Sequence, residues 1–305
     1  MKINRIENVH PETMDTPVTV KKCGNIFEIR YMRSSPVISI QKINADTYLD
    51  LKTGELKEIT SKVNRAQDKA SVSQSLRNLR DLINTNLTDP ENALWVTLTY
   101  AENMRDPIRL YEDFRRFWMR FRYYLKKHNY PSVEYIIAAE PQGRGAWHLH
   151  CLFFFCERAP FLPNTEIARI WRQGFTKTQS LKHIDNPGLY LTAYLGDMEL
   201  GEAMAIGHLY GMIKEATTYD GTKKAIIKGA RLHMYPAGFH LYRCSRGIQK
   251  PEIYHVTEEE AQRLIGDAPL KFERTIEVIN EAGMVQNIIN YRQYYLEISD
   301  YEEVF

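Results

Sequence analysis

Two histidines one residue apart give the first indication of chemistry in this sequence. His148 and His150 lie in the stretch GRGAWHLHCLFFF, positions 143–155. Side chains of a strand alternate between its two faces, so both imidazoles share one face if this stretch is extended. Two parallel imidazoles suit a divalent metal. With 9 histidines in 305 residues, such a pair also arises by chance roughly 0.26 times per chain, and two hydrogen-bonded core histidines are the alternative.

A carboxylate before the histidine pair can complete a ligand set. Glu140 ends the apolar stretch VEYIIAAE, and the Gly-rich stretch PQGRGA separates it from WHLHCLF. In a hairpin of these two stretches, Glu140 lies near His148 on the partner strand. Two neutral imidazoles and one carboxylate leave open positions on Mn²⁺ or Mg²⁺, which can then bind a phosphate as a Lewis acid. The alternative for Glu140 alone is a solvated residue at a turn.

Two tyrosines supply a candidate nucleophile. Tyr190 and Tyr194 are four residues apart in GLYLTAYL, after a helix start at Asn186-Pro187, and therefore share one helix face. A phenol that attacks a phosphodiester forms a covalent phosphotyrosine, which conserves the bond energy for later resealing. Because the chain has 19 tyrosines, a structural role is the alternative for either one.

The surrounding sequence predicts the elements that position these residues. Residues 94–100, WVTLTY with its preceding Leu, form a β-branched and aromatic strand, and residues 110–129 form a helix dense in Arg and aromatic side chains. The hairpin of residues 133–155 follows, and then the tyrosine helix. This order of strand, helix, two strands and helix predicts an α+β fold with a central antiparallel sheet and flanking helices.

Three motifs in this order resemble a known family. WVTLTY, AWHLHCLFF and GLYLTAYL are similar to motifs one, two and three of the HUH (His-hydrophobe-His) superfamily of single-strand endonucleases. Within it, the resemblance is closest to rolling-circle replication initiators of the filamentous-phage and Gram-positive mobile-element type. The Trp-x-x-Gly from Trp171 to Gly174 and the stretch RLHMYPAGFHLYRCSRGIQKP agree with that group. The resemblance covers about residues 60–250.

The resemblance implies an RRM/ferredoxin-like core and a metal-dependent, site-specific single-strand endonuclease and strand transferase. His148 and His150 would bind the divalent metal, with Glu140 as third ligand. Tyr190 would be the nicking nucleophile, forming a 5′-phosphotyrosine, and Tyr194 a second one for strand transfer. Many relatives carry Lys three positions after the catalytic Tyr. Here that position is Ala193, so the tyrosine pair or a lysine from elsewhere replaces it.

The expected partner is single-stranded or extruded origin DNA, with a helicase as a further partner and no membrane. Basic side chains would track the DNA backbone. The candidate DNA-binding residues are Arg115, Arg116, Arg120, Arg144, Lys177 and Lys182.

Charge and composition agree with a nucleic-acid-binding protein without requiring one. The net charge is +2, but residues 251–305 carry 4 Lys+Arg and 12 Asp+Glu, so the preceding residues are basic. We expect three parts: a β-rich segment at 1–60, the endonuclease domain at 61–220, and a basic, aromatic and then acidic β-rich part at 221–305. Four cysteines without CxxC spacing and no apolar run of membrane-spanning length favour a cytoplasmic protein.

Other functions remain open at this point. A non-catalytic nucleic-acid-binding protein with a similar sheet would use the histidines and tyrosines for packing. A relaxase or transposase of the same superfamily, or a metal-dependent hydrolase of a small substrate, would use them differently.

Overall fold

The computed structural model describes residues 2–35, 38–44, 46–60, 62–179, 181, 187–207, 212–217 and 223–296. The chain forms two compact units. One unites Met1–Ser61 with Lys250–Phe305, and the other is Lys62–Gln249. This grouping differs from the three consecutive parts expected from the sequence, because the two ends of the chain share one sheet and residues 223–249 lie with the expected endonuclease domain.

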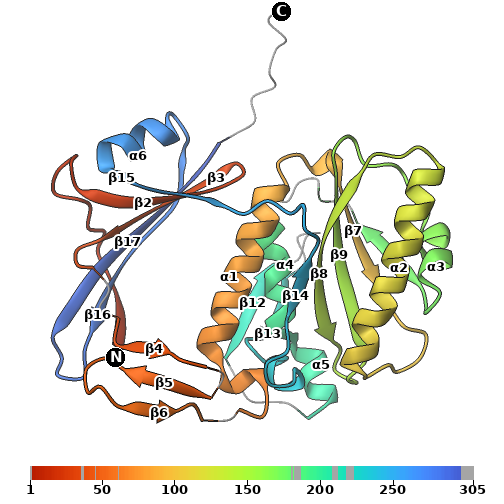
Figure 1. Ribbon diagram of the computed structural model, residues 1–305, viewed down its shortest axis with the longest axis horizontal. Coiled ribbons are helices and arrows are strands. Elements are labelled where there is room, and N and C mark those ends of the chain that lie inside the picture. Colours follow the sequence, from red (N-terminus) through yellow and green to blue (C-terminus); the bar gives the residue numbers. More distant parts are fainter. Residues whose placement is uncertain are drawn as a thin grey trace, which may run out of the picture. The chain divides into compact units, whose positions relative to one another are not determined.

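The unit formed by both chain ends contains two antiparallel sheets and one helix (Figure 1). Its elements are β1 (Lys2–Ile6), β2 (Pro17–Cys23), β3 (Ile26–Met32), β4 (Ile40–Lys42), β5 (Thr47–Asp50), β6 (Leu56–Glu58), β15 (Glu252–Thr257), α6 (Glu258–Ile265), β16 (Leu270–Ile279) and β17 (Val285–Tyr295). The large sheet has the order β1-β16-β17-β3-β2-β15, and β4-β5-β6 form the small one. Strands from the beginning and the end of the sequence therefore alternate in one sheet.

The helix α6 covers this large sheet. Ala261 and Ile265 of α6 are buried in one cluster with apolar side chains of β2 and β3. A capping box starts the helix, in which Thr257 and Glu260 satisfy each other's backbone N–H groups. At its first residue, the Glu258 carboxylate accepts two hydrogen bonds from Arg292 of β17, at 2.6 and 2.7 Å. Both side chains are buried.

The unit Lys62–Gln249 holds all candidate site residues. Its helices are α1 (Lys69–Asn86), α2 (Pro107–Lys127), α3 (Asn164–Trp171), α4 (Pro187–Gly196) and α5 (Leu200–Ala205). Its strands are β7 (Ala93–Leu98), β8 (Val133–Pro141), β9 (Trp147–Phe155), β10 (Thr176–Gln179), β11 (Met198–Glu199), β12 (Ile213–Thr217), β13 (Lys223–Ile227) and β14 (Tyr242–Cys244). The main sheet is antiparallel with the order β10-β7-β9-β8-β14, and β11-β13-β12 form a second sheet.

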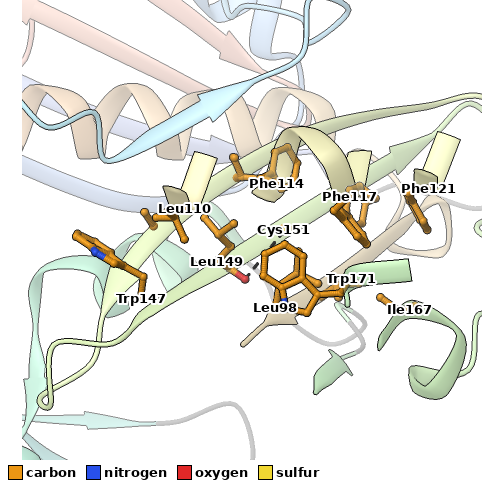
Figure 2. Close-up of a cluster of buried hydrophobic side chains, with 14 of the residues drawn as sticks. Leu98, Leu110, Phe114, Phe117, Phe121, Trp147, Leu149, Cys151, Ile167 and Trp171 are labelled. Atoms are coloured by element: carbon orange, nitrogen blue, oxygen red, sulfur yellow. Dashed lines mark hydrogen bonds between the residues drawn. The ribbon is translucent and has the colours of Figure 1, made fainter. Parts of the chain in front are cut away.

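One face of the main sheet packs against α2 and α3 (Figures 1 and 2). Asp106 caps α2 by accepting hydrogen bonds from the N–H groups of Ile108 and Arg109, and Pro107 takes the first helical position. The buried side of the helix repeats at three-to-four spacing: Leu110, Phe114, Phe117, Phe121 and Leu125. Alternate strand residues meet it: Leu98, Leu149, Cys151 and Phe153. Most of the apolar core of the unit lies here.

The opposite face of the main sheet packs against α1 and α4. Here the strands contribute the other set of alternating residues: Trp95, Ile136, Ala138, Leu152 and Phe154. Leu79 and Ile83 of α1 and Leu191 and Leu195 of α4 close this second cluster. In Figure 1, α1 and α4 lie on one side of β8 and β9, and α2 and α3 on the other.

The described elements agree with the predicted α+β class. They comprise six α-helices and antiparallel sheets, and the strand, helix, hairpin and helix expected between residues 94 and 196 are all present. None of the described helices is both long and apolar enough to cross a membrane.

Candidate functional site

The hairpin of β8 and β9 brings the three candidate ligands to one face. Its register pairs Glu140 with His148 and Ala138 with His150. Directly paired residues point to the same side of a sheet, and Ala138 belongs to the cluster beneath α1 and α4. Glu140, His148 and His150 therefore share the α1/α4 face, at the end of the hairpin near its turn.

The turn itself follows the Gly-rich sequence. The N–H of Gln142 donates to the carbonyl of Ala146 at 2.8 Å, and the N–H of Gly145 donates to the carbonyl of Gln142 at 2.7 Å. Gly145 has a φ of 84°, a conformation that favours glycine. The hairpin predicted from the sequence is thus confirmed.

Glu140 and His150 are in direct contact. The Glu140 Oε2 atom meets the His150 Nε2 atom in a short hydrogen bond. The second ring nitrogen of His150, Nδ1, lies 3.4 Å from the Thr97 hydroxyl on the neighbouring strand β7. The Trp95 ring packs beside the imidazole, with 6.1 Å between centroids. Both ring nitrogens of His150 therefore have partners, and its plane is fixed by the sheet.

A buried arginine reaches the same carboxylate from outside the hairpin. Arg231 is only 6% exposed, and its Nη2 atom lies 3.1 Å from Glu140 Oε1 and 2.5 Å from Glu202 Oε2. The guanidinium also donates to the carbonyl oxygens of Pro141 at 2.8 Å and Asp197 at 2.7 Å. Arg231 thus connects the end of β8 with the segment after α4 and with α5.

Glu202 extends this network into the turn. Its Oε1 atom accepts a hydrogen bond from the N–H of Gly143 at 2.6 Å. Burial alone would lower the pKa of Arg231, but the charges of Glu140 and Glu202 outweigh that effect and raise it. The guanidinium therefore stays charged, and it balances two carboxylates where water is largely excluded.

The protonation states suit metal ligation. Burial would raise the pKa of Glu140, but the hydrogen bond with His150 and the nearby charges of His150 and Arg231 hold it below its usual value. Burial lowers the pKa of His148 to about 4. At neutral pH, Glu140 is thus an anion and His148 a neutral imidazole with a free lone pair.

The donor chemistry fits a divalent cation, although the arrangement is not that of a finished metal site. Among the described residues, no three His, Cys, Asp or Glu side chains are grouped as ligands around one point. Glu140 and His150 spend their facing atoms on each other. A cation held by His148, His150 and Glu140 would replace that hydrogen bond, while the second oxygen of Glu140 kept its contact with Arg231.

The tyrosine helix α4 packs over the ligand-bearing face. Its apolar residues Leu191 and Leu195 join the cluster of that face. Gly188 allows a close approach to α1, since a Cβ there would lie 2.5 Å from the carbonyl oxygen of Arg80. The structure describes the helical backbone at Tyr190 and Tyr194, one turn apart, but not these two side chains.

Tyr235 ties the end of this helix to the strand that carries Glu140. It is fully buried, and its hydroxyl lies 2.9 Å from both the carbonyl oxygen of Ala139 in β8 and that of Leu195 in α4. Burial raises the pKa of this phenol well above its ordinary value, so it remains a hydrogen-bond donor. The tyrosine helix and the ligand hairpin are therefore linked through residue 235.

The candidate DNA-binding arginines of α2 have different surroundings. Arg115 is exposed. Arg116 makes ion pairs with Glu112 and Asp113, and Arg120 donates to the carbonyl oxygens that end α3. Those two side chains thus have structural partners. All of α2 packs on the face opposite the ligands.

The other candidate cations lie near the ligands or outside the described residues. Lys177 pairs with Thr97, and Thr97 pairs with His150, so Lys177 shares the ligand face. Arg144 is exposed in the hairpin turn. Lys182 lies outside the described residues.

Sequence reasoning missed Arg231, Glu202 and Tyr235. All three follow the tyrosine helix, in or before a stretch whose composition is typical of a basic and aromatic surface. Sequence alone does not separate a buried arginine from an exposed one. The resemblance of RLHMYPAGFH to a family region was the available signal, since it places Arg231 and Tyr235 in a shared motif.

Comparison with known proteins gives one match. No curated protein and no solved structure matches the chain. The matched stretch of the one family model begins at β7, contains the ligand hairpin and α4, and ends at β11. Over residues 93–199, the chain is similar to a family of replication-associated proteins of the ORF2 type.

Proposed function

We propose that the chain is a replication initiator that nicks and rejoins single-stranded DNA at an origin. The similarity of residues 93–199 to a replication-associated family supports a role in DNA replication. The observation that carries the enzymatic part is the meeting of Glu140 and His150 on the face covered by α4, inside that matched range.

The proposed ligands are His148, His150 and Glu140. Mn²⁺ or Mg²⁺ bound there would withdraw charge from the scissile phosphate. The chain's own residues fix this site: Thr97 orients His150, and Arg231 holds Glu140. Low exposure of Glu140 keeps water from competing for its oxygens.

The proposed nucleophile is Tyr190. Its hydroxyl oxygen forms a bond to phosphorus, the bond from phosphorus to the 3′ oxygen breaks, and a 3′-hydroxyl leaves with a proton. The phosphotyrosine retains the energy of the broken bond, so a 3′-hydroxyl can later attack it and restore the strand. Tyr194, one helical turn away, would serve a second transfer.

Lys177 is the proposed replacement for the lysine that relatives carry near the tyrosine. Position 193 is alanine, whereas Lys177 shares the ligand face through Thr97 and His150. Its ammonium would contact the phosphate or stabilise the phenolate.

A labelled single-stranded oligonucleotide and Mn²⁺ test the proposal. We expect a denaturation-resistant protein–DNA adduct that chelator abolishes. Tyr190→Phe should remove the nicking adduct and retain DNA binding, and Tyr194→Phe is the matched control. Cleavage that persists in the double variant would refute the tyrosine mechanism.

The second candidate is a non-catalytic nucleic-acid-binding protein. It is favoured by one observation, the engagement of Glu140 with both His150 and Arg231, which also suits a purely structural network. Binding without an adduct, and without a response to chelator, would favour it. Strand transfer only between two DNA ends would instead point to a relaxase or transposase.

A further inference from the structure

A groove runs along α2 on the face of the sheet opposite the candidate ligands. It consists of two cavities, of about 1020 and about 460 Å³. One wall is the outer side of α2, and the other is the edge strand β14 with the residues around it, 236–246. The α2 residues of both cavities recur at three-to-four spacing and so form one stripe beside the buried stripe.

The groove is basic, and its positive charge is not neutralised. The cations in its walls are Arg115, Arg122, Lys126, Arg243 and Arg246. All five are exposed, and within the described part of the chain none forms an ion pair with a carboxylate. Two carboxylates also line the groove, Glu112 and Glu134. Glu134 accepts a hydrogen bond from the N–H of Gly247, which leaves the cations in excess.

Aromatic rings alternate with these cations. Trp118 and Tyr135 meet edge to face with 4.6 Å between centroids, and the Arg122 guanidinium lies 6.0 Å from the Trp118 ring. In the smaller cavity, Arg243 lies 3.6 Å above the Tyr111 ring. Tyr123 is 69% exposed, so its ring presents an open face.

This combination fits a flexible polyanion that carries flat, unstacked rings. Phosphates would meet the cations, and unpaired bases would stack on the aromatic faces. Duplex DNA offers phosphates, but its bases already stack on one another and are not available to these rings. An acidic peptide offers charge without rings.

We propose that this groove binds a segment of single-stranded DNA that flanks the segment held at the ligand face. The identification of the nucleic acid as DNA rests on the proposed function. Leu149, Cys151 and Phe153 face α2, whereas His148 and His150 face α4. DNA in the groove is therefore separated from the reacting phosphate by the sheet, and the groove holds the strand without taking part in the chemistry.

Fluorescence anisotropy with 5′-labelled oligothymidylate tests this, using a long probe of about 30 and a short probe of about 8 nucleotides. The groove variant combines Arg122→Ala with Arg246→Ala, one from each wall. The control variant combines Arg158→Ala with Arg169→Ala, which are exposed and lie outside the groove. Both lose two positive charges, and melting curves verify that both fold.

The groove variant should bind the long probe at least tenfold more weakly than the control variant. The slope of log K against log[salt] should fall by about 1.4, from roughly 0.7 per lost phosphate contact. Tyr123→Ala should weaken binding about fivefold or more by removing one stacked base, whereas Tyr123→Phe keeps the ring and should bind normally. Equal affinity of groove and control variants for the long probe would overturn the proposal.

Two further arms separate this proposal from its alternatives. If polyglutamate competes as well as oligothymidylate and Tyr123→Ala has no effect, the groove is an acidic-peptide site and the proposal fails. Adduct formation with a saturating short probe should be equal in all groove variants. If the unaltered chain forms no adduct but the groove variants still lose binding, the nicking function fails and the groove remains a single-strand site.

Discussion

Replacement of Arg231 by methionine should destabilise the Lys62–Gln249 unit by about 3–5 kcal/mol, the usual cost of removing one partner from a buried ion pair. The side chain is 6% exposed and contacts the Glu140 and Glu202 carboxylates. Methionine fills similar volume but leaves both carboxylates without their cation. Glu140 suffers most, because it is itself only 7% exposed.

Tryptophan fluorescence during urea unfolding measures this loss in the correct unit. All four tryptophans, Trp95, Trp118, Trp147 and Trp171, lie between residues 62 and 249, so the signal reports on that unit alone. The control is Arg169→Met, whose ion pair with Glu166 is solvent-exposed. Its loss should cost less than about 1 kcal/mol.

A second substitution tests the reason for the destabilisation. Adding Glu140→Gln to Arg231→Met removes the uncompensated charge, so the double variant should recover about 1–3 kcal/mol relative to the single variant. If Arg231→Met costs no more than Arg169→Met, or if the two substitutions simply add, the guanidinium does not stabilise Glu140 through its charge.

Other substitutions test other parts of the fold. Gly188→Ala should destabilise the α1–α4 contact by about 1–3 kcal/mol because a Cβ would meet the α1 backbone, whereas Gly201→Ala in α5 has open space and should stabilise by up to about 1 kcal/mol; thermal melting compares them. Phe117→Ala should cost about 3–5 kcal/mol in urea unfolding, since the ring is fully buried. For Glu258, burial would raise the pKa, but hydrogen bonds from Arg292 and Gln262 lower it below 4.5. Its stabilising contribution is therefore complete above pH 4.5 and lost as pH falls through the folded-state pKa, so Glu258→Gln should flatten the acid limb of stability followed by circular dichroism, and an unchanged limb would contradict this.

The ligand hairpin was predictable because its signals are local. Alternation in WHLHCLFFF places His148 and His150 on one face, and the Gly-rich turn sets the register that pairs Glu140 with His148. Period-two patterning and a short turn are sufficient for such an element. The stripe of buried aromatic residues in α2 follows in the same way from helical spacing.

Pairings between distant segments were not predictable. The strands at the two ends of the chain were expected as strands, but nothing in their patterns indicates that β17 lies between β16 and β3. A strand's alternation specifies which side is buried and not which strand is its neighbour. The same limit explains why Arg231 was missed, since its partners come from β8 and α5.

The contacts of Arg231 and Tyr235 indicate that the candidate site needs more chain than the family match covers. The matched range ends at residue 199, yet Arg231 contacts Glu140 and Tyr235 joins the carbonyl groups of Ala139 and Leu195. Without these two side chains, Glu140 loses its buried counter-ion and α4 loses its hydrogen-bonded link to β8. Because a nucleophile and its ligands must be held within a fraction of an ångström of their reacting geometry, the segment after the tyrosine helix is as necessary to the proposed chemistry as the motifs before it.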